Sequence, residues 1–146
     1  MPEADIAVTT LSNSVGGKEL GAKVLEHVLS AAGLDPSPPR TPLPLPAVVR
    51  DEYVGRYDAG QWWLTVEAAD DGSLLMSQKL HDFDPPLPDE VRATFEGPPV
   101  ALALVDEDVV APADDLTRPS GDFLRDSAGR VQFLRYGLRV CRRVSD

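Results

Sequence analysis

The chain has 146 residues, of which 42% are hydrophobic, so it can bury the core of one ordinary domain or of a small domain with an appendage. Its formal net charge of −10 argues against nucleic acid and against an anionic membrane surface as partners. The single cysteine, Cys141, excludes an intrachain disulfide.

The N-terminal part predicts one strand and one helix. It lacks the basic segment and long apolar run of a signal peptide, so we expect a cytoplasmic location by default. Residues 5–13 (DIAVTTLSN) are apolar and β-branched before they turn polar, which is typical of a strand that needs neighbours on both sides. Residues 17–32 predict an amphipathic helix whose apolar half includes Leu20, Val24 and Leu25, and Gly33 ends it.

A proline-rich tether separates this part from the rest of the chain. Residues 34–46 contain six prolines, and proline fixes φ and removes a hydrogen-bond donor, so the segment is extended and semi-rigid. The sequence therefore predicts three parts: a strand and helix in residues 1–33, a linker in 34–46 and a second domain in 47–146.

The second domain is predicted to be mainly β. Short apolar runs alternate with turn signals such as "ADDG" and "DSAG", which favours an antiparallel barrel or sandwich. The chain as a whole is therefore expected to be mainly β, or α+β overall. The expected strands are 52–57, 61–68, 73–78, 93–97, 100–106, 109–113, 121–126, 131–137 and 138–144.

A search for catalytic chemistry finds no motif. None of the three lysines has a serine three residues before it, so no Ser-x-x-Lys nucleophile is present, and no Gly-x-Ser-x-Gly elbow occurs. Cys141 has basic neighbours but alternates within a strand-like run. His27 and His81 lack the spacing of a metal site. We therefore predict no catalytic residue, no metal and no cofactor.

Four aromatic residues are candidates for a ligand pocket. Alternation in "QWWLTVE" places Trp62 on one face of its strand and Trp63 on the other, and Tyr53 and Tyr57 flank Gly55. Barrels can hold apolar ligands in their mouths, so these four side chains could line such a site. Alternatively, one tryptophan fills the barrel, the other packs on a neighbour, and barrel closure explains the small Gly55.

The order of these parts resembles the C-terminal end of serine hydrolases related to class C β-lactamases and D-alanyl-D-alanine carboxypeptidases. In that family a strand like "DIAVTTLSNS", a helix and a tether lead to a lipocalin-like β-barrel. The barrel opens with Tyr-x-Gly-x-Tyr and closes with Phe-x-Arg-Asp-x-x-Gly-Arg-Val. The matching positions here are Tyr53, Gly55, Tyr57, Phe123, Arg125, Asp126, Gly129, Arg130 and Val131.

The resemblance covers essentially the whole chain, but the Ser-x-x-Lys, Tyr-x-Asn and Lys-Thr-Gly motifs of the family are absent. It implies a non-catalytic accessory region of a bacterial, β-lactamase-related enzyme, shaping substrate access or mediating assembly. The implied partner is the catalytic domain of a serine hydrolase, or a second copy bound through residues 5–32. The alternative is a free-standing lipocalin-like binder of a small apolar ligand, with Trp62 or Trp63 in the pocket.

Overall fold

The computed structural model describes residues 6–13, 17–34, 40–137 and 139–144. The chain divides into two compact units, unit 1 being Met1–Pro38 and unit 2 being Pro39–Asp146. Unit 1 contains the helix α1, and unit 2 contains the other helices and all the strands of the described residues. No helix within these residues is both long and apolar enough to span a bilayer.

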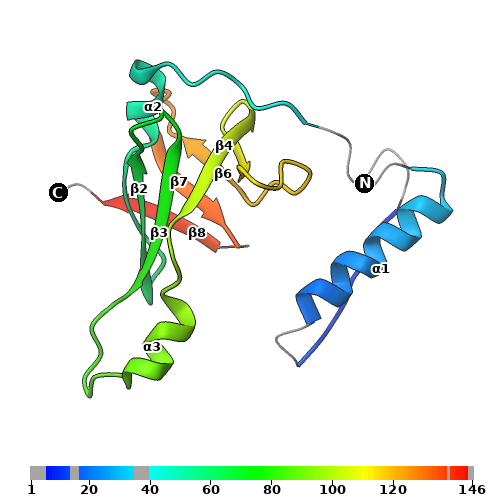
Figure 1. The fold of residues 1–146 in the computed structure, drawn as a ribbon, viewed down its shortest axis with the longest axis horizontal. Coiled ribbons are helices and arrows are strands. Elements are labelled where there is room, and N and C mark those ends of the chain that lie inside the picture. The colour runs from blue at the N-terminus through cyan, green and yellow to red at the C-terminus, as the bar shows by residue number, and fades with distance from the viewer. Residues whose placement is uncertain (1–5, 14–16, 35–39, 138, 145–146) are drawn as a thin grey trace. The chain divides into compact units, whose positions relative to one another are not determined.

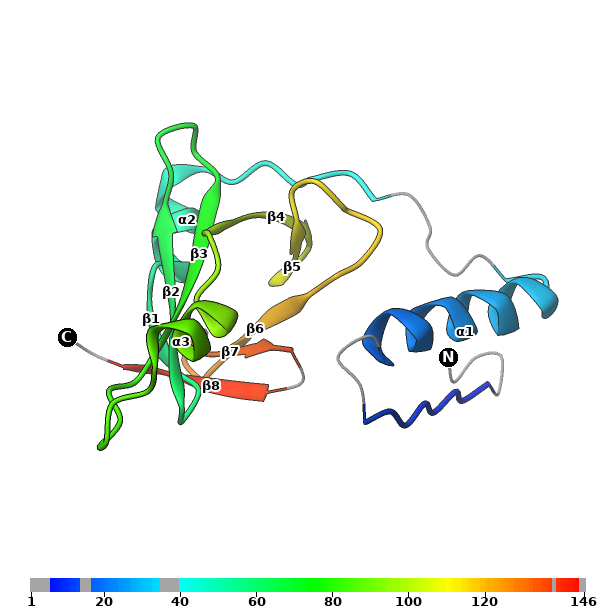
Figure 2. The same ribbon diagram turned by 60° about the horizontal axis from the view of Figure 1, so that its bottom comes forward.

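Unit 1 consists of α1 (Gly17–Ala31) with residues 6–13 running beside it (Figures 1 and 2). A Cβ atom added to Gly21 would lie 2.6 Å from the Thr10 Oγ1, and one added to Gly17 would collide with Ser12, so the two glycines allow a close approach. The helix ends as predicted. Gly33 has a φ of 72°, and the amide of Leu34 donates to the carbonyl of Leu29 at 2.9 Å.

The predicted strand at 5–13 differs from the structure. Residues 6–13 belong to no strand of the described sheet, and residue 5 lies outside the described residues. A strand is defined by the ladder it forms with a neighbour. Although its composition favours an extended chain, this segment lies against a helix, and the described residues of unit 1 include no sheet edge for it to join.

Unit 2 is a closed antiparallel barrel in which each strand pairs with the next along the chain (Figure 1). The circle closes because β1 pairs with β8, which matches Arg56 with Val144 and Asp58 with Arg142. The predicted mainly β fold is thereby confirmed, and the barrel is compatible with a lipocalin-like one. Its strands are β1 (Gly55–Asp58), β2 (Trp62–Ala68), β3 (Leu74–Leu80), β4 (Val100–Asp106), β5 (Val109–Pro112), β6 (Gly121–Arg125), β7 (Val131–Tyr136) and β8 (Arg139–Val144).

Two seams of the barrel are narrow. β2 and β3 pair along seven residues, whereas β3 and β4 pair only from Leu74 to Met76 on β3. β5 and β6 share two residue pairs, at Val109 and Val110 of β5. β3 and β4 therefore separate beyond Met76, and the intervening helix α3 packs beside β3 there (Figure 1).

Side chains fill the barrel interior. Alternate residues of the strands point inward, and those at its centre are almost completely buried. The most buried of these are Tyr57, Leu64, Val66, Leu74, Leu102, Val110, Leu134 and Cys141.

The sequence did not predict two short helices. Residues 93–97 were expected to form a strand, but α3 spans Asp89–Phe95. Acidic residues in its first turn and an i, i+4 pair between Arg92 and Glu96 favour the helix. Similarly, the expected strand at 52–57 begins as the helix α2 (Ala47–Tyr53), and β1 starts only at Gly55.

Candidate functional site

Two of the predicted site residues, Tyr53 and Tyr57, lie in the core at the barrel end that α2 covers. Their side chains are 3% and 0% exposed, and both rings contact Phe123, with centroid distances of 4.6 and 5.9 Å. The Tyr57 hydroxyl donates to the Tyr53 carbonyl at 2.7 Å, and burial raises the pKa of Tyr57 to about 12. The Tyr57 hydroxyl therefore joins β1 of the barrel wall to the last residue of α2.

Arg125 links α2, the β4–β5 turn and β6. Its Nε donates to Asp108 Oδ2 at 2.8 Å, its Nη1 donates to Glu52 Oε2 at 2.7 Å, and the Tyr53 hydroxyl donates to Asp108 Oδ1 at 2.9 Å. Hydrogen bonds to Asp108 and then Glu52 raise the pKa of Arg125. Asp108 has a φ of 59°, so the turn is held in the left-handed region. The charged groups satisfy one another, as expected of a structural latch.

A second arginine closes the same end from the inside. The Arg143 guanidinium donates to the carbonyls of Glu52, Val54 and Val131 at 3.0, 2.5 and 3.3 Å. A Cβ atom on Gly55 would lie 2.9 Å from Arg143 Nε, and Gly55 has a φ of 155°. Packing with Arg143 therefore explains the glycine between the two tyrosines without any ligand.

The two tryptophans lie on opposite faces of β2. Trp62 packs against the core, and the guanidinium of Arg139 lies 4.7 Å from its ring centroid. Trp63 lies on the outer face, with the ring of His81 at 4.2 Å and the guanidinium of Arg56 at 4.6 Å. The structure thus divides the four predicted residues among the core, the rim and the outer surface, and does not bring them together in one pocket.

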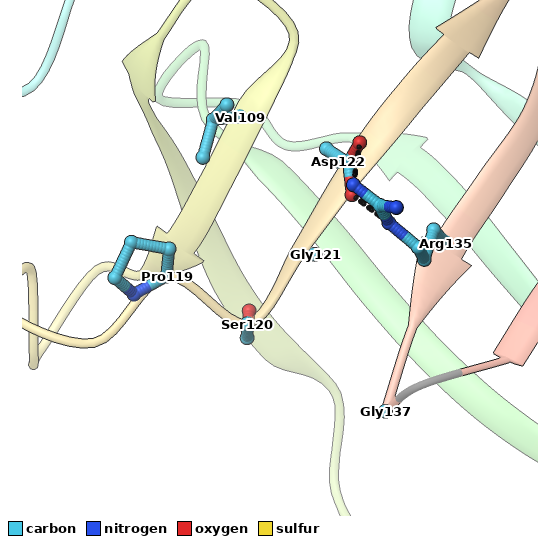
Figure 3. Close-up of a pocket in the computed structure, with 7 residues that line it drawn as sticks. All are labelled: Val109, Pro119, Ser120, Gly121, Asp122, Arg135 and Gly137. Atoms are coloured by element: carbon cyan, nitrogen blue, oxygen red, sulfur yellow. Dashed lines mark hydrogen bonds and ion pairs between the residues drawn. The ribbon is translucent and has the colours of Figure 1, made fainter. Parts of the chain in front are cut away.

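A pocket of about 340 Å³, which no sequence pattern predicted, opens beside β6 (Figure 3). Arg135 lies opposite Asp122 and donates to both of its carboxylate oxygens, at 2.7 and 2.9 Å. The Ser120 hydroxyl is buried and has no hydrogen-bond partner among the described residues. The pocket is lined by Val109, Pro119, Ser120, Gly121, Asp122, Arg135 and Gly137.

This pocket contains little that could catalyse a reaction. Its acid and base form a closed pair, and the residues lining it include no histidine or lysine to activate Ser120. The pocket offers a ligand one unpaired hydroxyl, that of Ser120, beside the apolar side chains of Val109 and Pro119. A sequence signal for it is lacking because Asp122 and Arg135 meet only through the register of β6 with β7.

Two further reactive side chains among the described residues are those of Cys141 and His81. Cys141 is fully buried, and burial raises the pKa of its thiol, which favours the unreactive protonated form. His81 Nε2 lies 3.6 Å from Asp58 Oδ1. Among the residues that the structure describes, no three His, Cys, Asp or Glu side chains are grouped as metal ligands would be.

Comparison with known proteins gives a structural likeness only. No family model and no curated protein matches the sequence. Two similar solved structures are described as crystal structures of SurE and of SurE with D-Leu, with 26% and 23% sequence identity and a TM-score of 0.50 in each case. The matches cover 90% of this chain, and the chain spans only 28% of the length of each SurE chain.

This finding corrects the predicted family. The matching structures carry the name SurE and not that of a β-lactamase or carboxypeptidase, and no sequence match supports a serine hydrolase. The predicted accessory role in a β-lactamase-related enzyme is corrected with it. The structure explains why the motifs misled: Tyr53, Gly55 and Tyr57 close the barrel and Arg125 forms its latch. Such residues report the architecture of a barrel, and carry no information about attached chemistry.

Proposed function

We propose that this chain is a non-catalytic barrel module that associates through unit 1 with a larger polypeptide similar to the rest of a SurE chain. The proposal rests on how much of each chain the structural match covers. The match includes 90% of this chain but only 28% of each SurE chain. In the SurE structures, the matched region is thus part of a polypeptide more than three times as long. A counterpart to that remainder is the natural partner for this module.

The helix of unit 1 offers the contact surface for such a partner. The side chains of Leu20, Val24 and Leu25 are 62%, 37% and 42% exposed, and Leu11 beside the helix is 96% exposed. We call the three residues on α1 the unit 1 face. Covering the three on α1 would contribute roughly 3 kcal/mol, since full burial of such a side chain is worth about 1.5–3 kcal/mol. An apolar surface of this kind commonly marks a protein contact.

The barrel itself supports a structural role more than a binding role. One SurE structure holds D-Leu. The centre of this barrel is filled by buried side chains such as Leu64, Leu102 and Leu134, so we expect no D-Leu to bind inside it. For the same reason, the described residues give no specific support to the alternative of a free-standing binder of small apolar ligands. We propose that D-Leu binding, if restored, requires the larger polypeptide.

Reconstitution tests this proposal. The chain is mixed with SurE from which the matched region has been deleted, and mass is measured by size-exclusion chromatography with light scattering. We expect a one-to-one complex that is lost in a Leu20→Glu/Leu25→Glu variant. It should persist in a Val48→Glu variant, because Val48 is 76% exposed on unit 2 and provides a matched control.

Three results would contradict the proposal. A chain that stays monomeric with the partner present has no docking function in unit 1. A homodimer that excludes the partner would replace the proposal with self-association through the same face. Titration calorimetry with D-Leu gives an independent readout, and binding of D-Leu by the module alone would show that the filled barrel has a site of its own.

A further inference from the structure

Helix α3 is held to the barrel by its polar side. Arg92 and Glu96, whose side chains are 22% and 24% exposed, form an ion pair at 2.8 Å. The Glu96 carboxylate also accepts a hydrogen bond from the amide of Leu80 at 2.9 Å, and the carbonyl of Phe95 accepts one from the Gln78 side chain at 3.0 Å. These contacts fix the helix beside β3, where β3 and β4 have separated.

Val91 and Phe95 lie on a flank of α3, roughly 100° around the helix from Arg92 and Glu96, which face β3. No residue of this helix is buried, and Val91 and Phe95 are 41% and 46% exposed. Residues four apart lie next to each other on a helix, so these two side chains form one patch. A surface helix normally places its apolar side chains on the core and its charges in solvent. In α3 the Arg92–Glu96 pair faces β3 instead, and Val91 and Phe95 stay about half exposed.

Acidic residues are frequent in the segment that carries the patch. The segment from Leu80 to Pro98 contains five acidic residues and one arginine, Arg92, which is paired with Glu96 and lies 3.7 Å from a carboxylate oxygen of Asp82. The side chain of Asp82 is fully exposed at 104%, and the others that remain are also exposed. The nearby cation on β3 is Lys79. Apart from Asp82 and Glu96, which both lie within ion-pair distance of Arg92, the acidic residues of the segment are Asp84, Asp89 and Glu90.

We propose that the side of α3 that carries Val91 and Phe95 is a docking surface for a cationic amphipathic helix of a protein partner. The apolar residues of that helix would cover Val91 and Phe95, and its lysine or arginine side chains would meet the exposed carboxylates of the same segment. Charge complementarity selects this occupant, because the local excess of exposed carboxylates repels an acidic partner and an anionic bilayer alike. The docking surface is independent of the unit 1 face and does not rest on the function proposed above.

A synthetic helix of leucine and lysine, labelled for fluorescence anisotropy, tests the proposal on the full chain. We expect saturable binding that Val91→Ser/Phe95→Ser weakens about tenfold or more. The control Val48→Ser, which alters a more exposed valine of unit 2, should change it less than about twofold. Equal weakening by the two variants, or no binding by the wild type, would overturn the proposal.

Charge is tested with a second matched pair. Asp89→Asn/Glu90→Gln should weaken binding several-fold and reduce its dependence on salt, whereas Asp70→Asn/Glu107→Gln, with the same change in net charge, should have little effect. If the two pairs behave alike, the peptide responds only to the net charge of −10, and the proposal fails.

A variant could lose binding simply because its α3 unfolds. Amide chemical shifts of the wild-type chain, measured while the peptide is added, locate the binding site without any substitution. On adding the peptide, shifts should concentrate in residues 89–97. Shifts concentrated in α1 instead would place the site on the unit 1 face and refute the α3 proposal. A Leu20→Glu/Leu25→Glu variant should retain the peptide affinity, which separates failure of this inference from failure of the proposed assembly function.

Discussion

Replacing Tyr57 with phenylalanine tests how α2 is held against the barrel. The tyrosine is completely buried, and its hydroxyl donates to the Tyr53 carbonyl at 2.7 Å. A hydrogen bond of this kind contributes about 1 to 1.5 kcal/mol, and phenylalanine keeps the ring that packs on Phe123. At neutral pH we therefore expect the variant to lose about 1 to 1.5 kcal/mol of unfolding free energy.

The same hydroxyl makes the difference depend on pH. Burial raises the pKa of Tyr57 to about 12 in the folded chain, whereas an unfolded tyrosine has a pKa of about 10. The protonated form is thus favoured by folding. Its contribution is complete below about pH 10 and is lost as the pH rises toward about 12. At about pH 11 the wild type should have lost roughly 1.4 kcal/mol through this group, which is close to the value of the hydrogen bond.

The wild type and Tyr57→Phe should therefore differ in stability near neutral pH and become similar near pH 11. Urea denaturation followed by tryptophan fluorescence measures both values. Tyr136→Phe, which alters a half-buried tyrosine at the far end of β7, serves as the control for general alkaline effects. A difference between wild type and Tyr57→Phe that stays constant from neutral pH to pH 11 would refute the reasoning.

Three further predictions concern single residues. Gly121→Ala should destabilise the barrel by about 1–3 kcal/mol in urea denaturation, because its Cβ would lie 2.5 Å from the Arg135 carbonyl oxygen. Gly97→Ala, whose Cβ meets no atom within 4 Å, should change stability by less than about 0.5 kcal/mol. Cys141 should react with a thiol reagent only after unfolding, and fast reaction of the native chain would contradict its burial and raised pKa. Arg125→Gln should cost about 1–2 kcal/mol in the same denaturation assay, and an unchanged midpoint would show that the latch is dispensable.

Periodicity in the sequence predicted the elements whose packing follows a single local pattern. The apolar spacing from Leu20 to Leu29 indicated α1, and the alternation from Trp62 to Val66 indicated β2 with its inward face. The helix α3 was missed because "ATFEG" is too short to show a helical period. The pair that stabilises it, Arg92 with Glu96, forms a side-chain contact that a strand prediction does not consider.

The candidate sites were less predictable because they depend on contacts between distant residues. Arg125 meets Glu52, which lies 73 residues earlier, and Asp108, which lies 17 residues earlier. Nothing local marks these groups as partners. The pocket beside β6 depends in the same way on the register that brings Asp122 to Arg135. The resemblance of short motifs could not supply this information, since the same residues serve the closure of a barrel whatever is attached to it.

The pairing of β1 with β8 also constrains when the chain can fold. During synthesis β1 emerges about eighty residues before its partner, so its outer edge stays unpaired until Arg139–Val144 have left the ribosome. Contacts between such distant segments slow folding and expose strand edges meanwhile. Arg143 of β8 completes the closed end of the barrel at this step, because its guanidinium donates to carbonyls beside β1. The barrel can therefore close only when β8, its last strand in the sequence, has been synthesised. Until then the free edge of β1 has no partner to keep it from pairing with other chains.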